Sequence, residues 1–410
     1  MSMFRRSSCE ALTFQTKAIA AATATAPASI RLPWPPLDPR LVLRGQQQSQ
    51  SPSPSPSQSP PQSQSGDRSA SSGNTVKSRG QRLGHLRQSS SLPLPLPPSP
   101  HRRTSQHRLF SSTRLAMTAT KIDGTAIANS IRERIHAEIE ATQKVNPQYK
   151  PSLKIIQVGD RSDSSTYVRA KLKAAEQASI DCELLQYPET ISEVELLKEI
   201  TRLNHDTTVH GILVQLPVPA HISEYAVTSA VADEKDVDGF GARNIGELAK
   251  RGGRPLFIPC TARGVMALLD AADIDLTGKN AVVLGRSNIV GSPVSYLFKN
   301  ADATVTVCHS RTVGLEEHVK NADILVTATG KANFVKGEWL KQGVVVIDVG
   351  TNFIPDETKK SGQRLVGDVD FASASEVASY ITPVPGGVGP MTVAMLLQNV
   401  VDAAARSSES

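Results

Sequence analysis

The chain has 410 residues, with 45 basic and 39 acidic side chains, four cysteines and 4% aromatic residues, which is long enough for two or three domains of about 100–200 residues each. Its first 115 residues hold 15 basic residues and three acids, which is a net charge of +12. Residues 116–410 therefore carry a net charge of −6, and the composition of this part does not indicate nucleic-acid binding. The cysteines are widely spaced without a CxxC motif, which argues against a disulfide framework or a zinc knuckle, and Cys260 is expected to be buried rather than reactive. No apolar run of about 18 residues indicates a membrane span.

Residues 1–116 form a basic extension rich in Pro, Ser and Gln, with runs such as SPSPSPSQSPPQSQS. Such a sequence buries too little apolar surface to offset its chain entropy, so we expect it to be disordered. A basic, acid-poor N-terminus is typical of a transit peptide and favours mitochondrial import. Translation could instead begin at Met117, which would give a cytoplasmic protein. A plain disordered extension, or an extension that also binds RNA, stays open.

The folded part opens with a helical pattern. Apolar residues recur at helical spacing, at Ala126, Ile127, Ile131, Ile135 and Ile139. Asp123 or Thr125 is the expected helix cap. The following patterns predict alternating strands and helices at 152–159, 164–179, 181–188, 193–206 and 210–219. We expect Ser164 or Ser165 to cap the helix at 164–179, and a loop over 233–260.

A second alternation follows the loop. It predicts helices at 261–272, 292–300 and 391–404, and strands at 280–285, 303–310, 322–330 and 344–352. The expected class is α/β with parallel sheets. We expect an α/β domain at 117–260 joined by the helix at 391–404, and a Rossmann-type domain at 261–390. The two domains would leave a cleft between them.

The segment VVLGRSNIVGSPVSYLF, residues 282–298, predicts a strand, a glycine turn and an amphipathic helix. Gly285 and Gly291 allow the backbone to approach a pyrophosphate, and the start of the helix offers free N–H groups and a positive dipole end. The segment departs from GxGxxG, because Ser287 and Val290 stand at the second and third glycine positions. Taken alone, it is also compatible with an ordinary strand–turn–helix.

The next strand ends in His309, Ser310 and Arg311, without an acidic residue. NAD-binding domains place an acid there for the ribose 2′-OH, whereas guanidinium groups and a hydroxyl suit a 2′-phosphate. Together with Arg286 in the glycine turn, this end favours NADP over NAD, with solvated surface arginines as the alternative. The expected cofactor-binding residues are Gly285, Arg286, Ser287, Gly291, Ser310, Arg311 and Thr329.

Candidate catalytic side chains lie in the first domain. Tyr167 and Lys171 stand four residues apart on one predicted helix and therefore share a face. Gln215 ends a strand and Asp238 lies in the loop KDVDG; ligands of open α/β sheets bind beyond the carboxyl ends of strands, so Lys171, Gln215 and Asp238 are expected to converge. The alternatives are surface side chains and a plain acidic turn, since two carboxylates alone make a poor calcium site. We expect no metal.

The segment ITPVPGGVGPMT, residues 381–392, holds three glycines and three prolines before a predicted helix. A rigid turn that leads into a helix N-terminus is typical of the wall of a binding cleft. A purely structural connection is the alternative.

Nine motifs in this order and spacing resemble the methylenetetrahydrofolate dehydrogenase/methenyltetrahydrofolate cyclohydrolase family. The resemblance covers about residues 118–402. The motifs are YVRAKLKAA, GILVQLPVP, EKDVDGF, PCTARGV, GRSNIVGSP, HSRT, DVGTN, GDVDF and PVPGGVGPMT.

The resemblance implies a homodimeric enzyme whose first domain binds folate and whose second binds the cofactor. Such enzymes oxidise 5,10-methylenetetrahydrofolate to the methenyl form and hydrolyse that form to 10-formyltetrahydrofolate. The family pattern implies that Lys171 is the general acid/base of hydrolysis, that Gln215 positions it and tunes its pKa, and that Asp238 holds the pterin. It also implies that Tyr167 orders the folate rings. The implied substrate-binding residues are Tyr167, Gln215, Asp238, Pro385, Gly386 and Gly387.

Some family members are fused to a formyltetrahydrofolate synthetase, and an absent P-loop and a short Ser-rich end lead us to expect no such activity here. Some dehydrogenase-only relatives lack the lysine, so Lys171 favours the bifunctional form. The alternatives are an NAD-dependent dehydrogenase-only relative, another two-domain dehydrogenase, and a catalytically silent dinucleotide-binding protein.

Overall fold

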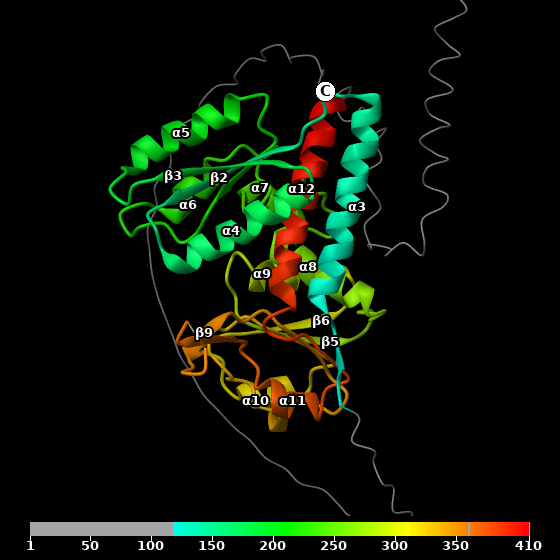
Figure 1. Ribbon diagram of the computed structural model, residues 1–410. Helices are drawn as coiled ribbons and strands as arrows, with labels where there is room; N and C mark the ends of the chain where they lie inside the picture. Colours follow the sequence, from blue (N-terminus) through cyan, green and yellow to red (C-terminus); the bar gives the residue numbers. More distant parts are fainter. Residues whose placement is uncertain (1–117, 360, 410) are drawn as a thin grey trace, which may run out of the picture. The chain divides into compact units, whose positions relative to one another are not determined.

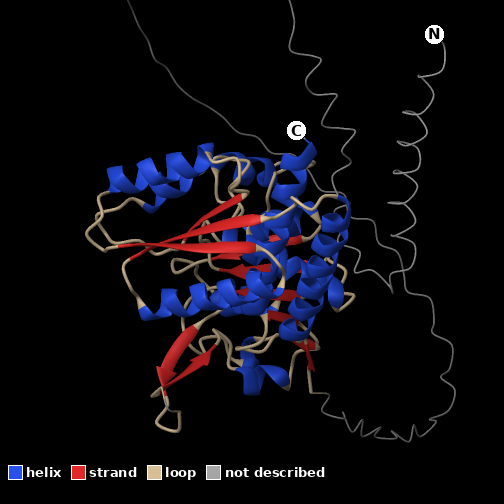
Figure 2. Ribbon diagram, turned by 45° about the horizontal axis from the view of Figure 1, so that its top comes forward, coloured by secondary structure: helices blue, strands red, loops and turns tan. Residues whose placement is uncertain are grey.

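The computed structural model describes residues 118–359 and 361–409. The predictions of disorder and of a transit peptide for residues 1–116 lie outside the described residues. The described chain forms two parallel sheets with helices on both faces, which confirms the predicted α/β class (Figures 1 and 2).

The first sheet has the order β3-β2-β4, and all its strands are parallel. Its strands are β2 (Ser152–Val158), β3 (Asp181–Tyr187) and β4 (Gly211–Val214). Its helices are α4 (Ser162–Gln177), α5 (Glu193–His205) and α6 (Glu224–Ser229). Alternate residues of β2 enter different cores: Ile155 packs in the cluster that contains α4, and Ile156 in the cluster that contains α5 and α6.

The second sheet has the order β1-β11-β8-β7-β5-β6 and is also parallel. Its strands are β1 (Thr120–Lys121), β5 (Asn280–Leu284), β6 (Thr304–Cys308), β7 (Ile324–Thr327), β8 (Val345–Asp348) and β11 (Tyr380–Ile381). Its helices are α9 (Gly291–Asn300), α10 (Leu315–Lys320), α11 (Phe371–Ser375) and a 3₁₀ turn at Gly337–Trp339. A hairpin of β9 (Asn352–Pro355) and β10 (Gln363–Val366) follows β8.

Four further helices complete the described fold: α3 (Gly124–Val145), α7 (Ala242–Ala249), α8 (Cys260–Ala271) and α12 (Val388–Glu409). Helix α12 packs against α3 and α8, and their apolar residues belong to the core that includes one face of each sheet (Figure 1). Among the described helices, α12 is long and apolar enough to cross a membrane, but most of it is buried inside the protein. It therefore has the composition of a core helix.

Local sequence explains where several helices begin. Asp123 caps α3, because its side chain accepts a hydrogen bond from the Ala126 N–H at 3.1 Å, as predicted. The predicted cap of α4 is wrong: the helix begins at Ser162, and Ser165 Oγ instead donates to Asp160 Oδ1 at 2.8 Å.

The structure has several elements that were not predicted, among them the short helices α6, α10 and α11. Helix α7 lies inside the segment 233–260 that was expected to be a loop. The hairpin of β9 and β10 was not predicted, and neither were the two-residue strands β1 and β11, which pair with each other. Through this pairing, residues near the start of the described chain complete the second sheet.

Asp270, in the last turn of α8, is a half-buried carboxylate with one unpaired oxygen. Its Oδ2 atom has no hydrogen-bond partner, and burial raises its pKa to about 6. The folded state therefore holds this proton more tightly than the unfolded chain, so the contribution to stability is full below the usual aspartate range and is lost as the pH rises through about 6.

We expect Asp270→Asn to stabilise the protein above about pH 6. Because Asp270 is half-buried and solvent screens its charge, the expected gain is about 1 kcal/mol. Urea unfolding of both proteins at acidic and neutral pH measures it. An equal difference at both pH values would show that the carboxylate charge is not the cause.

Candidate active site

Lys171 of α4 and Gln215, which follows β4, meet at the carboxyl end of the first sheet. Lys171 Nζ donates to Gln215 Oε1 at 2.9 Å, and Gln215 Nε2 donates to the Leu216 carbonyl at 2.8 Å. The second bond fixes which end of the amide faces the lysine. Burial lowers the pKa of Lys171, although the nearby Asp238 opposes this effect. A lysine with a lowered pKa can exchange a proton nearer to neutral pH.

Asp238 lies beside this pair. A parallel bridge between Ile212 and Asp236 adds the preceding residues to the edge of β4, so Asp238 also follows a carboxyl end. Burial raises the pKa of Asp238 and the charge of Lys171 lowers it. Tyr167 lies one turn before Lys171 on the same face of α4 and is 37% exposed.

The two carboxylates of the KDVDG loop have different environments. Asp236 is buried and accepts hydrogen bonds from the N–H groups of Gly239 and Gly241, at 3.1 and 2.7 Å, and from Asn244 Nδ2 at 2.8 Å. Asp236 therefore shapes the loop and the start of α7, while Asp238 is left to face Lys171. The sequence pattern alone does not separate these two carboxylates.

Cys260, the first residue of α8, also reaches Asp238. Its Sγ lies 3.3 Å from the Val237 carbonyl oxygen and 3.9 Å from Asp238 Oδ1. Burial and the Asp238 charge raise the pKa of this thiol well above its usual value. Cys260 therefore remains a neutral thiol and is a poor nucleophile.

The candidate cofactor residues lie at the carboxyl edge of the second sheet. The order β6-β5-β7 means that the chain changes direction across β5, and ligands of such sheets bind at this switch point. Leu284 pairs with both Cys308 and Thr327, so the segments that begin at Gly285, His309 and Ala328 leave neighbouring strands at the same level.

The turn after β5 requires glycine at two positions. A Cβ atom on Gly285, whose φ is +121°, would overlap the Ala328 carbonyl oxygen, and one on Gly291 would overlap the Gly285 carbonyl oxygen. The chain packs against itself too closely at this turn for a side chain at either position, which is why both positions are glycine.

The start of α9 differs from the expected row of free N–H groups. Ser287 Oγ accepts from the N–H groups of Val290 and Gly291, at 3.2 and 3.4 Å, and the Ser287 carbonyl accepts from Ser292. Pro293 has no N–H. The Ser287 hydroxyl proton remains available to an anion, together with the positive end of the helix dipole.

The basic and hydroxyl side chains around this turn fit a phosphorylated dinucleotide. Arg286, Ser310 and Arg311 are exposed, and no carboxylate of the described residues pairs with either guanidinium. Thr329 Oγ1 is buried without a hydrogen-bond partner. An unpaired buried hydroxyl carries a free-energy cost that a bound polar group would remove.

Two buried aspartates shape the loops of the cofactor edge. Asp368 accepts hydrogen bonds from the N–H groups of Thr329, Gly330 and Lys331. Asp348 accepts from the N–H groups of Asp368 and Val369, at 3.0 and 2.9 Å. Burial raises the pKa of Asp348 to about 6. Asp348 and Asp368 lie in the motifs DVGTN and GDVDF, and the sequence pattern alone predicts no role for these carboxylates.

The loop with Pro385, Gly386 and Gly387 connects β11 to α12. The Thr125 N–H donates to the Gly386 carbonyl at 3.1 Å, and a Cβ on Gly124 would overlap the Gly387 carbonyl oxygen. The loop therefore fixes the starts of α12 and α3 against each other. These contacts join the loop to the start of α3.

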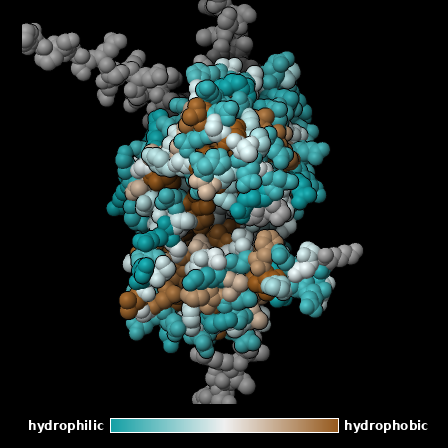
Figure 3. All heavy atoms as spheres, turned by 90° about the vertical axis from the view of Figure 1, so that its left-hand side faces the viewer, coloured by the Kyte–Doolittle hydropathy of each residue, from teal (hydrophilic) through white to brown (hydrophobic). Residues whose placement is uncertain are grey.

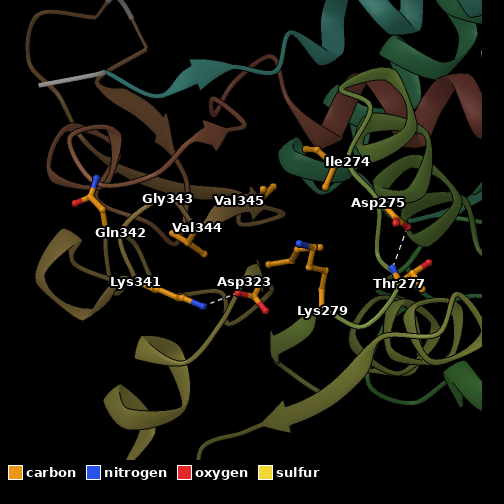
Figure 4. Close-up of a pocket in the computed structure, with 11 residues that line it drawn as sticks. Ile274, Asp275, Thr277, Lys279, Asp323, Lys341, Gln342, Gly343, Val344 and Val345 are labelled. Atoms are coloured by element: carbon orange, nitrogen blue, oxygen red, sulfur yellow. Dashed lines mark hydrogen bonds and ion pairs between the residues drawn. The ribbon is translucent and has the colours of Figure 1, made fainter. Parts of the chain in front are cut away.

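An apolar hollow is visible on the face that Figure 3 shows, and concave apolar surfaces with a few polar groups are typical of ligand sites. A separate cavity of about 390 Å³ lies at the amino ends of β5, β7 and β8. Figure 4 shows it beside the 2.6 Å ion pair of Lys341 and Asp323. It lies at the opposite ends of the strands from the candidate cofactor residues, which follow the carboxyl ends.

Comparisons with known proteins agree with this arrangement. Residues 122–238 match the tetrahydrofolate dehydrogenase/cyclohydrolase catalytic domain, and residues 259–408 match the NAD(P)-binding domain of the same family. The mitochondrial C-1-tetrahydrofolate synthase of Saccharomyces cerevisiae is 59% identical over 285 residues, which are 70% of this chain and 29% of that protein. This chain thus spans less than a third of that relative.

Two further relatives match along nearly their whole length. The bifunctional protein FolD 2 of Arabidopsis thaliana is 52% identical over 70% of this chain and 96% of its own. The methylenetetrahydrofolate dehydrogenase-cyclohydrolase of Trypanosoma brucei, solved with NADP cofactor and inhibitor, is 43% identical, with a TM-score of 0.70 over 72% of this chain and 99% of its own. The chain belongs to the tetrahydrofolate dehydrogenase/cyclohydrolase family.

Proposed function

We propose that the protein oxidises 5,10-methylenetetrahydrofolate with NADP and hydrolyses the methenyl product to 10-formyltetrahydrofolate. The observation that carries this proposal is the hydrogen-bonded pair of Lys171 and Gln215 beside Asp238, in a domain that matches the family's catalytic domain. The second domain supplies a glycine turn and unpaired arginines suited to NADP.

Lys171 is the proposed proton carrier of the hydrolysis. When water adds to the methenyl carbon, a neutral Lys171 takes one of its protons, and the resulting ammonium gives that proton to the folate nitrogen that leaves the carbon. The hydroxyl proton leaves to solvent as the formyl carbonyl forms. Burial, which lowers the pKa of Lys171, raises its neutral fraction, and Gln215 Oε1 keeps the amine in place.

Asp238 and Tyr167 are the proposed folate-binding groups. A carboxylate held beside Lys171 can accept hydrogen bonds from the amino and ring N–H groups of a pterin. The exposed ring of Tyr167, one turn from Lys171, offers a flat surface on which a ring system stacks.

Bound NADP would supply the hydride acceptor. The Arg286, Ser310 and Arg311 side chains would hold its 2′-phosphate. The Ser287 hydroxyl and the backbone at Gly285 would hold its pyrophosphate, and Thr329 Oγ1 would bond another polar group of the cofactor. The oxidation itself requires orientation of the substrate more than a protein base, because the folate nitrogen lone pairs drive hydride departure.

Progress curves with the full chain test the proposal. The protein is mixed with 5,10-methylenetetrahydrofolate and either NADP or NAD, and reduced cofactor and acid-quenched methenyl product are followed together. We expect reduction of NADP without accumulation of the methenyl form. Accumulation would remove the hydrolysis from the proposal, and absence of reduction with both cofactors would contradict it altogether.

We also propose that the active form is a homodimer and that the N-terminal extension directs mitochondrial import. Relatives include proteins named mitochondrial and cytoplasmic, and the basic, acid-poor composition of residues 1–116 supports the former. Light scattering of the purified chain measures the assembly. Imaging of a C-terminal fluorescent fusion, begun at Met1 or at Met117, tests the import.

A further inference from the structure

Asn399 of α12 is a buried amide at the back of the Asp238 loop. It has no solvent exposure. Its Nδ2 donates to the carbonyl oxygens of Val237 and Ile258, at 2.7 and 3.1 Å, and its Oδ1 accepts from Arg263 of α8. Both ends of the amide therefore have partners, and its orientation is fixed by the two carbonyls.

These contacts lie next to Asp238. The Val237 carbonyl belongs to the peptide bond that joins Val237 to Asp238, so Asn399 holds the peptide plane immediately before the carboxylate. The same Nδ2 atom lies 3.5 Å from Cys260 Sγ, which itself contacts the Val237 carbonyl and Asp238 Oδ1. Asn399 and Cys260 thus restrain both the backbone and the side chain of Asp238.

Docking of α12 does not require an amide at this position. The neighbouring residues Leu396, Leu397 and Val400 are almost fully buried in the core shared with α3 and α8. A leucine in place of Asn399 would pack well among these residues, but it would leave the Ile258 carbonyl without a hydrogen-bond partner and the Val237 carbonyl with only the weaker Cys260 thiol. The amide oxygen of Asn399 bonds Arg263 of α8, and its N–H groups bond the carbonyls of the segments on either side, so the N–H donors are explained by the loop that they hold.

We propose that Asn399 is a positioning residue of the folate site, which fixes the Asp238 carboxylate relative to Lys171 from a helix about 160 residues further along the chain. The inference rests on the proposed role of Asp238 in folate binding. It makes α12 part of the substrate site as well as of the core.

The test replaces Asn399 by aspartate, which keeps the shape and the contact to Arg263 but removes both N–H donors. We expect the KM for 5,10-methylenetetrahydrofolate to rise about tenfold, which corresponds to about 1.4 kcal/mol of lost restraint. The KM for NADP should stay unchanged, because the candidate cofactor residues are on other loops. A merely structural role would raise both KM values together or neither, and either result would overturn the proposal.

Gln398→Glu is the matched control. It makes the same amide-to-carboxylate change one residue earlier on α12, where the side chain bonds Arg134 and Asp402 instead of the Asp238 loop. We expect it to leave the ratio of the two KM values as in the wild type. An equal rise in the folate KM of this control would show that the effect comes from disturbing α12.

A double-mutant cycle links Asn399 to Asp238. If Asn399 acts through Asp238, Asn399→Asp should add little to the loss of folate affinity in Asp238→Asn protein, measured by titration with a folate substrate. A full additional loss would contradict the proposal. If Asn399→Asp does not fold, Cys260→Ala replaces it, with a smaller rise in the folate KM expected and an unchanged value as the contrary result. Wild-type turnover separately tests the proposed function.

Discussion

Replacing Lys171 with methionine should abolish most of the hydrolysis while sparing much of the oxidation. General acid–base assistance is worth about 10²–10⁴-fold in rate, and methionine keeps the packing of the lysine stem but carries no proton. The oxidation needs no protein base in the proposed mechanism. Rates of methenyl hydrolysis and of NADP reduction, measured separately on Lys171→Met protein, show the division, and the methenyl form should accumulate during turnover.

Lys173→Met is the control for this experiment. Lys173 is exposed on the same helix two residues later, so it does not share the face of Tyr167 and Lys171. Both activities should stay near their wild-type values. A parallel fall of both activities in Lys171→Met would instead assign Lys171 to substrate binding or to folding.

The pH dependence of the hydrolysis should report the same lysine. The base is the neutral amine, so the rate should rise with pH and level off above the pKa of Lys171. Because burial lowers this pKa, the rise should end below the usual lysine value of 10.5. This rise of the rate with pH should be absent from the residual hydrolysis that the Lys171→Met protein catalyses.

The sequence predicted those elements that have a local cause. The isoleucines of α3, with Ile131, Ile135 and Ile139 buried, form the predicted helical stripe, and Asp123 provides its cap. The missed elements are short or depend on distant partners. Helix α7 has eight residues and is held at its start by Asp236 and Asn244, and β1 exists only through its pairing with β11.

The same distinction applies to the candidate site. Lys171 and Gln215 could be expected to meet, because both lie near the carboxyl ends of parallel strands, and the structure has them hydrogen-bonded. The sequence could not predict that Asp236 holds the loop by hydrogen bonds while Asp238 faces Lys171, because both aspartates occur in the same five-residue loop. Asn399 carries no sequence signal at all, since its partners Val237 and Ile258 are more than a hundred residues away.

Replacing Arg286 and Arg311 together with glutamine should remove most of the preference for NADP. A hydrogen bond to a charged group is worth about 1.5–3 kcal/mol, or roughly 10–100-fold per arginine, and a dianionic phosphate gains most from it. Both side chains are exposed without a carboxylate partner in the described part of the chain, so their removal leaves no buried charge behind. We expect the KM for NADP to rise about 100-fold or more, while the KM for NAD changes little.

Ser310→Asp provides a second, independent change at the same place. It puts an acid at the end of β6, where NAD-binding domains accept a hydrogen bond from the ribose 2′-OH, and it repels a phosphate. The KM for NADP should rise and that for NAD should fall. Arg202→Gln is the control, because Arg202 pairs with Glu199 on α5 of the other sheet. If Arg286→Gln/Arg311→Gln raised both cofactor KM values by the same factor, the arginines would contact the pyrophosphate common to NADP and NAD, and the preference would have to come from other residues.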